Sequence, residues 1–306
     1  MTGLIVRRVV RGLLTLWVVL TLVFFGLRLS GDPVRLLLGD EASPEAYAAM
    51  RERLELNEPA AIQYVKYLQL VAQGDFGDSI REKRPVTEVV FARLPATLVL
   101  ACAAMAISVL VGIPIGIIAA RKRNSLLDRG LMAFAFFGQS APSFFVGILL
   151  ILTFSMWLTW LPSAGRGGWQ HLIMPAIALS TALTASLARF SRSAVLEVLG
   201  QDYVRTARAK GLSELRVTST HILRNAAIPV LTIFGLQVGL AISGAVVTET
   251  VFAWPGVGRL ATSSVLGRDY PVMQFVVILI AASVVVTNFV VDILYGIADP
   301  RIRRAS

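Results

Sequence analysis

The sequence contains very few of the side chains that form disulfides or bind metals. Its 306 residues include one cysteine, Cys102, and two histidines, His171 and His221. A single cysteine can form no disulfide within the chain, so it gives no information about the redox compartment. The two histidines lie in different predicted loops, and a lone histidine does not make a metal site. We therefore predict no bound metal.

Charged residues are also scarce. They make up 16% of the chain, whereas a soluble globular protein usually contains about a quarter. Hydrophobic residues account for 56%, and the mean hydropathy is +0.70. Two stretches, Ala96–Ala120 and Leu131–Leu161, contain no charged residue. Because about 20 apolar residues in a helix cross a bilayer, these runs exclude an ordinary soluble domain and predict an all-α, polytopic membrane protein.

Motifs for common enzyme chemistry are missing as well. A Walker A loop requires a Gly-Lys pair, and the chain has none, so it is not expected to bind ATP in that way. Neither the H-E-x-x-H zinc motif nor the G-x-S-x-G nucleophile motif occurs. We therefore predict no catalytic residue and no cofactor bound by this chain. Energy for transport must come from a partner or from an ion gradient.

Ion-driven carriers usually keep ionisable residues inside their membrane spans. Here Glu249 and Asp292 lie near span ends, no acidic residue lies at mid-span, and we see no inverted repeat. A proton-coupled carrier is therefore the less favoured alternative. Glu249, Asn288 and Asp292 are candidate pathway or gate residues. Asn288 and Asp292 lie four residues apart on one helical face, which fits either a gate or a structural hydrogen bond between helices.

Hydropathy predicts six transmembrane helices within a single domain that covers residues 1–306. They are expected near Val9–Leu29, Ala96–Ala120, Phe134–Leu161, Leu172–Ala188, Ala226–Val247 and Val272–Leu294. The fourth is short and rich in serine and threonine, which suits a helix packed inside a bundle. The basic N-terminus resembles a signal peptide, but its apolar run is long and no cleavage pattern follows. We interpret it as a retained first span.

The predicted loops differ in charge. The external loop at residues 30–95 has eight basic and eleven acidic residues, a net charge of −3. The loop Arg121–Gly130 has four basic residues against one acidic residue, and the loop Arg189–Asn225 has seven against three. The tail at residues 299–306 is basic as well. The positive-inside rule then predicts cytoplasmic N- and C-termini, and it explains the net charge of +10 without a nucleic-acid partner.

Two glycine pairs lie within predicted spans at a spacing of four residues. They are Gly112 with Gly116, and Gly235 with Gly239. Small residues at this spacing let helices approach closely. Such a face fits packing within one chain or a seam with another subunit, and packing within the chain is favoured because these motifs are common in membrane helices.

The loop Arg189–Asn225 is the most informative segment. Asp202 is predicted to be the N-cap of a short helix at Tyr203–Lys210, which Gly211 would end in the left-handed conformation. Ser213 would then cap a second short helix. The expected result is a sharp helical corner that projects from the membrane.

The chemistry of the first of these helices fits two roles. Ala207 and Ala209 would permit close docking into a groove on a partner, where Arg205, Arg208 and Lys210 would meet acidic groups. An amphipathic helix lying on anionic lipid would show the same pattern. On physical grounds the two alternatives stay open.

The run D-Y-V-R-T-A-R-A-K-G-L resembles the cytoplasmic EAA loop of ATP-binding-cassette (ABC) importer permeases. Its residues are most similar to the form of this loop found in the dipeptide and oligopeptide branch. The family's Glu-Ala-Ala maps onto residues 205–207 and its glycine onto Gly211, although Arg205 and Thr206 depart from the general pattern. In that family the loop forms a coupling helix that fits a cleft on the ATPase. The residues to which the resemblance assigns this role are Asp202, Tyr203, Arg205, Thr206, Ala207, Arg208, Lys210, Gly211 and Leu212.

Further motifs along almost the whole chain are similar to the same branch. They are Gly31-Asp32-Pro33, Leu56-Asn57-Glu58-Pro59, the run from Gly74 to Ser79, Trp254-Pro255-Gly256, Arg268-Asp269-Tyr270-Pro271 and the run from Asp299 to Arg303. Each motif is weak alone. Together, in this order, they are specific for the family, and the long external loop marks the first of its two permease subunits.

The resemblance implies a type I ABC importer permease fold in the bacterial cytoplasmic (inner) membrane. It also implies a heterodimer with a second homologous permease subunit, two cytoplasmic ATPase subunits that bind ATP and magnesium, and an extracytoplasmic substrate-binding protein. The external loop is a reasonable docking surface for that binding protein. The expected function is import of short peptides, with nickel chelates, glutathione or oligosaccharides as alternatives, because selectivity in the family rests largely with the binding protein.

Overall fold

The computed structural model describes residues 2–29, 34, 43–53 and 57–298. Within these ranges all regular structure is helical, apart from one isolated bridge between Asp78 and Pro85. The predicted all-α class is therefore confirmed. The motifs at residues 31–33 and 299–303, position 56 and the basic tail lie outside the described residues.

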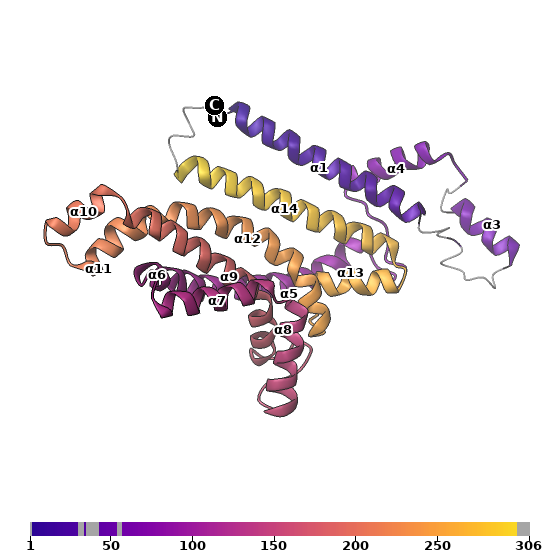
Figure 1. The fold of residues 1–306 in the computed structure, drawn as a ribbon. Helices are drawn as coiled ribbons and strands as arrows, with labels where there is room; N and C mark the ends of the chain where they lie inside the picture. Colours follow the sequence, from indigo (N-terminus) through magenta and orange to yellow (C-terminus); the bar gives the residue numbers. More distant parts are fainter. Residues whose placement is uncertain (1, 30–33, 35–42, 54–56, 299–306) are drawn as a thin grey trace.

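The helices follow one another along the chain as labelled in Figure 1. Their bounds are α1 Thr2–Leu29, α3 Pro44–Arg53, α4 Ala60–Gln73, α5 Val86–Ile107, α6 Ile113–Arg121, α7 Leu126–Ser140, α8 Ser143–Leu150, α9 Gln170–Leu199, α10 Asp202–Ala209, α11 Glu214–Arg216, α12 Arg224–Val251, α13 Val257–Leu266 and α14 Tyr270–Ala298. Three π-helical turns continue them: Ser108–Gly112 joins α5 to α6, Ile151–Trp157 extends α8, and Val217–Leu223 joins α11 to α12.

Five continuous helical stretches are long and apolar enough to cross a membrane. They are Val6–Gly26, Val86–Arg121, Gln170–Leu199, Glu214–Val251 and Tyr270–Val291. A sixth crossing would consist of α7 together with α8 and its extension. Most of these helices reach beyond the spans predicted from hydropathy. Hydropathy marks only the part of a helix that suits lipid, whereas polar turns at its ends continue the same backbone hydrogen bonding.

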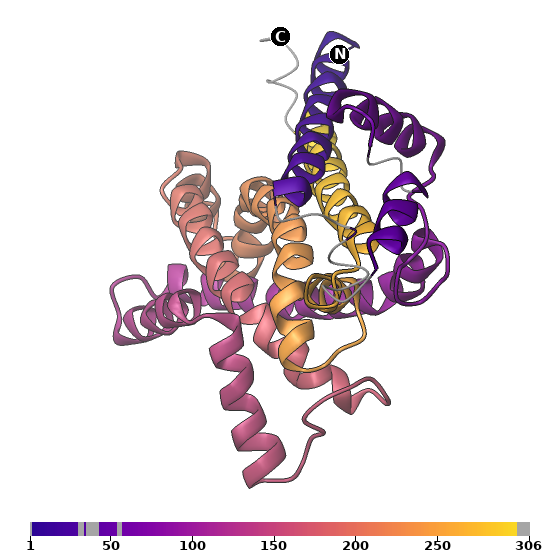
Figure 2. The same ribbon diagram turned by 90° about the vertical axis from the view of Figure 1, so that its right-hand side faces the viewer.

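The third predicted span, Phe134–Leu161, contains a sharp bend that hydropathy did not predict. The two helices within it meet at 101°. Pro142 lacks an N–H group, and its ring disfavours helical geometry in the preceding residue. Ala141 is accordingly extended, with ψ of 122°, and the helix resumes at Ser143. Figures 1 and 2 both show α8 pointing away from the side of the bundle occupied by α1.

Helix α9 is central to the bundle and packs against α5, α6, α7, α8 and α12. Small residues permit this packing. A β-carbon added to Gly116 of α6 would lie 2.4 Å from the carbonyl oxygen of Ala188 on α9. One added to Gly235 of α12 would lie 2.3 Å from a methyl group of Val291 on α14. The two predicted glycine pairs therefore face helices of the same chain, as the favoured alternative required.

Helix α1 lies at the edge of the bundle, contacts mainly α14, and is exposed along most of its length. Near its end, Phe24 packs against Tyr64 and Tyr67 of α4, with ring centroids 5.1 and 5.4 Å away. Figure 1 shows α3 and α4 at one end of the molecule, called here the α4 end. Helices α10 and α11 lie at the opposite end, the α10 end, toward which the N-terminus of α1 also points.

Candidate functional site

The loop Arg189–Asn225 forms a helical corner at the α10 end (Figure 1). Helix α10 begins one residue earlier than predicted. Gln201 is its extended N-cap, with ψ of 146°, so the prediction that Asp202 is the N-cap is wrong. The second helix is not a separate short element. No glycine or proline separates Glu214 from Arg224, and the helix continues unbroken into α12.

One face of α10 packs against its own chain. Val204 and Ala207, three residues apart, are 0% and 5% exposed. They join an apolar cluster that includes Leu187 and Val195 of α9 and Ala226 of α12. The prediction that Ala207 faces a groove on a partner is therefore wrong, because its small side chain instead allows α10 to lie close to the bundle.

The opposite face of α10 is exposed. Tyr203 is 42% exposed, and Arg205, Thr206 and Lys210 are exposed as well. Asp202 makes only a loose ion pair with Arg205, at 3.7 Å, and both side chains are largely in solvent. Such a surface pair contributes little to stability, so these side chains are available to a partner.

A tight turn closes the corner. Gly211 has φ of +78°, which confirms the predicted left-handed conformation, and its N–H donates to the Arg208 carbonyl at 2.9 Å. Leu212 turns back and packs against the apolar cluster behind α10. Ser213 is extended and is the N-cap of the following helix, as predicted. A residue with a β-carbon is strained at the glycine position because φ is positive.

An ion pair joins the two sides of this turn. The Arg208 Nε donates to Glu214 Oε1 at 2.7 Å, and Nη2 donates to Oε2 at 3.3 Å. The hydrogen bond that Arg208 donates to Glu214 raises the pKa of the Arg208 guanidinium above its usual value. Arg208 was predicted to meet an acidic group on a partner, but the structure supplies that group from the same chain. Glu214 was not predicted as a functional residue. It is the first residue of the next helix, and no local sequence pattern indicates that its side chain contacts Arg208 across the turn.

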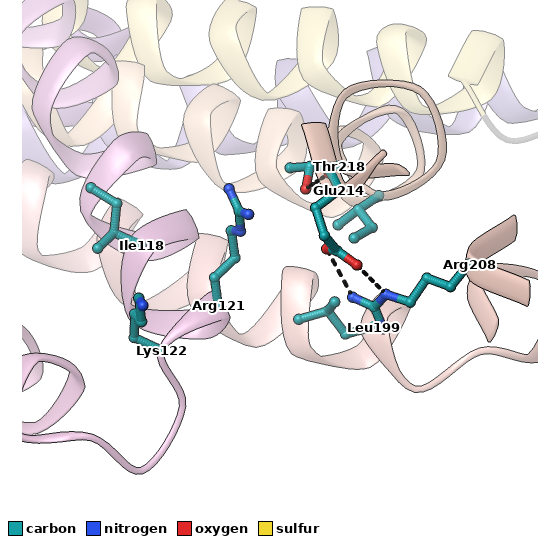
Figure 3. A pocket seen from close by; sticks show the side chains of 8 residues that line it. Ile118, Arg121, Lys122, Leu199, Arg208, Glu214 and Thr218 are labelled. Atoms are coloured by element: carbon teal, nitrogen blue, oxygen red, sulfur yellow. Dashed lines mark hydrogen bonds and ion pairs between the residues drawn. The ribbon is translucent and has the colours of Figure 1, made fainter. Parts of the chain in front are cut away.

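A cavity of about 370 Å³ lies behind the corner, between the ends of α6 and α9 and the start of α11. Its walls combine charged and apolar side chains. They are Ile118, Arg121, Lys122, Leu199, Arg208, Glu214, Thr218 and Ile222. Figure 3 shows Arg121 and Arg208 approaching Glu214 from opposite sides.

A second ion pair fixes the start of α7 to α9. The buried carboxylate of Asp128 accepts two hydrogen bonds from Arg192, from Nε at 2.7 Å and from Nη2 at 2.8 Å. It also accepts the Asn124 N–H at 3.0 Å. Paired bonds of this geometry hold both orientation and distance. Neither partner was singled out from the sequence, because 64 positions separate them and no local pattern joins them.

Two of the three gate candidates, Glu249 and Asn288, have described side chains, and the structure places them apart. Glu249, fully buried near the end of α12, accepts hydrogen bonds from the Thr97 hydroxyl at 2.6 Å and the Arg259 N–H at 3.0 Å. It thus joins α5, α12 and α13 instead of lining an open path. Asn288 is exposed on α14, where it lines a groove beside α1. The side chain of Asp292 lies outside the described residues.

Another buried carboxylate joins two of the sequence motifs. Asp269 accepts hydrogen bonds from the Ser79 hydroxyl at 2.5 Å, the Ile80 N–H at 3.1 Å and the Arg81 N–H at 3.4 Å. Phe76 and Phe275 pack beside them, with ring centroids 4.2 Å apart. The segment that precedes α5 is thereby attached to the start of α14.

Comparison with known protein families assigns the chain to a family. Residues 112–304 match the family described as "Binding-protein-dependent transport system inner membrane component". Residues 1–101 match "Binding-prot-dependent transport system membrane comp, N-term". The chain belongs to this family. It is accordingly a multi-pass inner-membrane transport subunit and not an enzyme, and its system includes an ATPase and a substrate-binding protein.

Two similar proteins align with this permease over almost its full length. The glutathione transport system permease protein GsiC of Salmonella paratyphi A is 45% identical over 304 residues, 99% of each chain. The di/tripeptide transport system permease protein DppB of Pseudomonas aeruginosa is 44% identical over 333 aligned positions, again 99% of each chain.

Solved structures share the fold. An inward-facing structure of the MetNI methionine ABC transporter aligns with a TM-score of 0.61 and 18% identity, covering 70% of this permease and 97% of that chain. An amino acid ABC transporter aligns with a TM-score of 0.55 and 17% identity, covering 69% and 94%. The predicted type I ABC importer permease fold is therefore confirmed.

Proposed function

We propose that this permease imports short peptides through a pathway that it shares with a second, homologous permease subunit. The proposal is supported by full-length similarity to permeases named for glutathione and for di- and tripeptides. Short peptides are the main proposal, and glutathione, nickel chelates and oligosaccharides are the alternatives.

The helical corner at the α10 end is proposed to dock on an ATPase subunit. The observation that carries this assignment is the division of α10 into an anchored face and a free face. Val204 and Ala207 fix the helix to the bundle, while Tyr203, Arg205 and Lys210 face outward. A coupling element passes on force only if it is seated firmly on its own subunit. ATP and magnesium belong to the two partner ATPases in this scheme.

Orientation in the membrane is part of the proposal. The basic loops and the N-terminus lie toward the α10 end, which would be cytoplasmic. Cys102→Ala removes the native thiol, after which single cysteines are placed at Ala60 and Ser213, both exposed in the structure. An impermeant thiol reagent on intact cells should label position 60 and leave position 213 unlabelled. The reverse pattern would exclude this orientation.

Uptake by the reconstituted importer tests the function. The permease is combined in proteoliposomes with its second permease subunit, the two ATPases and the binding protein. We expect ATP-dependent uptake of labelled dipeptides or tripeptides, and no ATP hydrolysis by the purified permease alone. Uptake without ATP under a proton gradient would instead identify a gradient-driven carrier. Selective uptake of glutathione, a nickel chelate or an oligosaccharide would identify one of the alternative substrates.

A further inference from the structure

The cavity behind the helical corner lies where three membrane-length helices end. Arg121 is the last residue of one such stretch, Leu199 the last of another, and Glu214 the first of a third. All three line the cavity. Ile118 lies within the charge-free run Ala96–Ala120, and Arg121 and Lys122 follow that run directly. This wall of the cavity therefore lies where an apolar helix leaves the hydrocarbon core and meets the lipid headgroups, whereas Leu199 and Glu214 lie well beyond the apolar parts of their helices.

The walls of the cavity have two kinds of chemistry. Three cationic side chains, Arg121, Lys122 and Arg208, line the cavity together with one carboxylate, that of Glu214. Arg208 is already held by that carboxylate, so the positive excess rests on the other two cations. Ile118, Leu199 and Ile222 supply an apolar surface beside them in the same cavity.

The two remaining cations are ready to bind an anion. Arg121 and Lys122 are exposed, and neither makes an ion pair or a side-chain hydrogen bond with any residue that the structure describes. The positive charge of Arg121 does act at longer range on the Glu214 carboxylate. Arg121 and Lys122 are neighbours in the sequence, and a guanidinium together with an ammonium provides several donors for phosphate oxygens.

We propose that this cavity binds the headgroup of an anionic phospholipid, with the phosphate held by Arg121 and Lys122. Basic pockets between transmembrane helices on the cytoplasmic side are suited to such headgroups. A soluble anion would use the cations but would gain nothing from Ile118, whereas the glycerol and upper acyl region of a lipid would cover this side chain. Binding needs only that the cavity lies at a membrane surface, and the choice of the cytoplasmic leaflet rests on the proposed orientation.

The site adjoins the ion pair that closes the corner. Arg121 lies on one side of Glu214 and Arg208 on the other (Figure 3). A bound phosphate would engage Arg121 and leave the Glu214 carboxylate to Arg208 alone. The lipid would thus favour the Arg208–Glu214 ion pair, which closes the turn after α10. The lipid site and the helical corner would be linked through Glu214, which belongs to both.

Native mass spectrometry of the purified importer complex tests the site. The complex is equilibrated in nanodiscs of phosphatidylethanolamine and phosphatidylglycerol and then released from them in the mass spectrometer. The mass of the released complex shows which lipids stay bound and how many. The test variant is Arg121→Gln with Lys122→Gln. The matched control is Arg123→Gln with Arg129→Gln, which removes one charge from the turn after α6 and one from the first turn of α7, both outside the cavity.

We expect the wild type and the control to retain phosphatidylglycerol and the test variant to bind it about thirtyfold more weakly. That factor corresponds to about 1 kcal/mol for each lost cation. Equal loss in both double variants would show general surface attraction and would overturn the site. Unchanged lipid retention by the test variant, with weakened association of the ATPase, would show that the cavity holds an acidic side chain of that partner. The measurement needs no substrate uptake, so it stands apart from the proposed transport function.

Discussion

The Asp269 carboxylate gives a direct test of how the segment before α5 is held in place. It is buried and accepts hydrogen bonds from the Ser79 hydroxyl at 2.5 Å and from the Ile80 N–H at 3.1 Å, with a longer one from Arg81. We expect Asp269→Ala to release this segment from the start of α14. Asp269→Asn should release it less, because asparagine keeps one acceptor oxygen.

The magnitude follows from these bonds. A hydrogen bond to a charged group contributes about 1.5–3 kcal/mol. Counting only the bonds from Ser79 and Ile80, Asp269→Ala should cost about 3–6 kcal/mol. Since about 1.4 kcal/mol is a factor of ten in an equilibrium constant, the lower figure raises the detached population about a hundredfold. The asparagine variant should show roughly half of that free-energy cost.

Amide hydrogen exchange at residues 79–84 measures this detachment in the purified complex, and stimulation of the ATPase by the loaded binding protein measures its consequence. Exchange should rise about a hundredfold in Asp269→Ala, and stimulation should fall if the external segment serves as a docking surface. Asp78→Asn is the matched control, because that carboxylate is exposed nearby. Wild-type exchange in Asp269→Ala would refute the reasoning and would assign the attachment to the contact between Phe76 and Phe275.

Three further variants test the packing and the corner. Gly116→Val would place a β-carbon 2.4 Å from the Ala188 carbonyl oxygen, so α6 must move off α9 at a cost of at least about 1–3 kcal/mol, and size-exclusion chromatography should show aggregation. Gly211→Val meets no atom within 4 Å but strains a φ of +78° by about 1–2 kcal/mol. It should reach normal membrane levels, with near-absent uptake and ATPase activity that no longer responds to the binding protein. Asp128→Asn breaks the pair with Arg192, which should cost about 3 kcal/mol and lower the thermal unfolding midpoint.

Each of these variants has a control. Gly130→Val serves the first, because a β-carbon there meets nothing within 4 Å, and equal aggregation would contradict the packing argument. Gly200→Val serves the second, because a φ of −80° suits any residue. Wild-type uptake by the Gly211 variant would show that the corner is a passive, lipid-facing helix. For the third, Asp128→Asn with Arg192→Gln should recover part of the lost stability, and no recovery would mean that another contact holds α7 to α9.

Features that depend on neighbours in the sequence were predicted well. Long apolar runs predicted membrane helices because an unpaired backbone N–H or C=O group is costly in lipid, and a helix pairs these groups within one segment. Gly211 was predicted in the left-handed conformation because a short helix had to end there and only glycine adopts that geometry without strain. Proline in the third span could also have predicted the bend, since the rule that Pro142 disfavours helix at Ala141 is equally local.

Contacts between distant residues were not accessible in this way. Asp269 and Ser79 are 190 positions apart, and either residue alone looks like an ordinary polar side chain in a loop. The two faces of α10 are an intermediate case. Val204 and Ala207 form an apolar stripe among charged neighbours, which predicts an inward face. That signal competes with the family pattern, which draws attention to the alanine as a docking residue.

The corner and the buried Glu249 network are parts of one helix. The stretch Glu214–Val251 is continuous over 38 residues, which at about 1.5 Å per residue is roughly 57 Å. Its departures from regular α geometry, the π-helical turn Val217–Leu223 and Pro229, both lie in the half near the corner. Kinks arise at such positions, so a displacement of α10 would be absorbed or redirected there. Helix α12 packs along α9 and α14, and Glu249 joins its far end to α5 and α13, so the corner and the Glu249 network lie at the two ends of one packed helix.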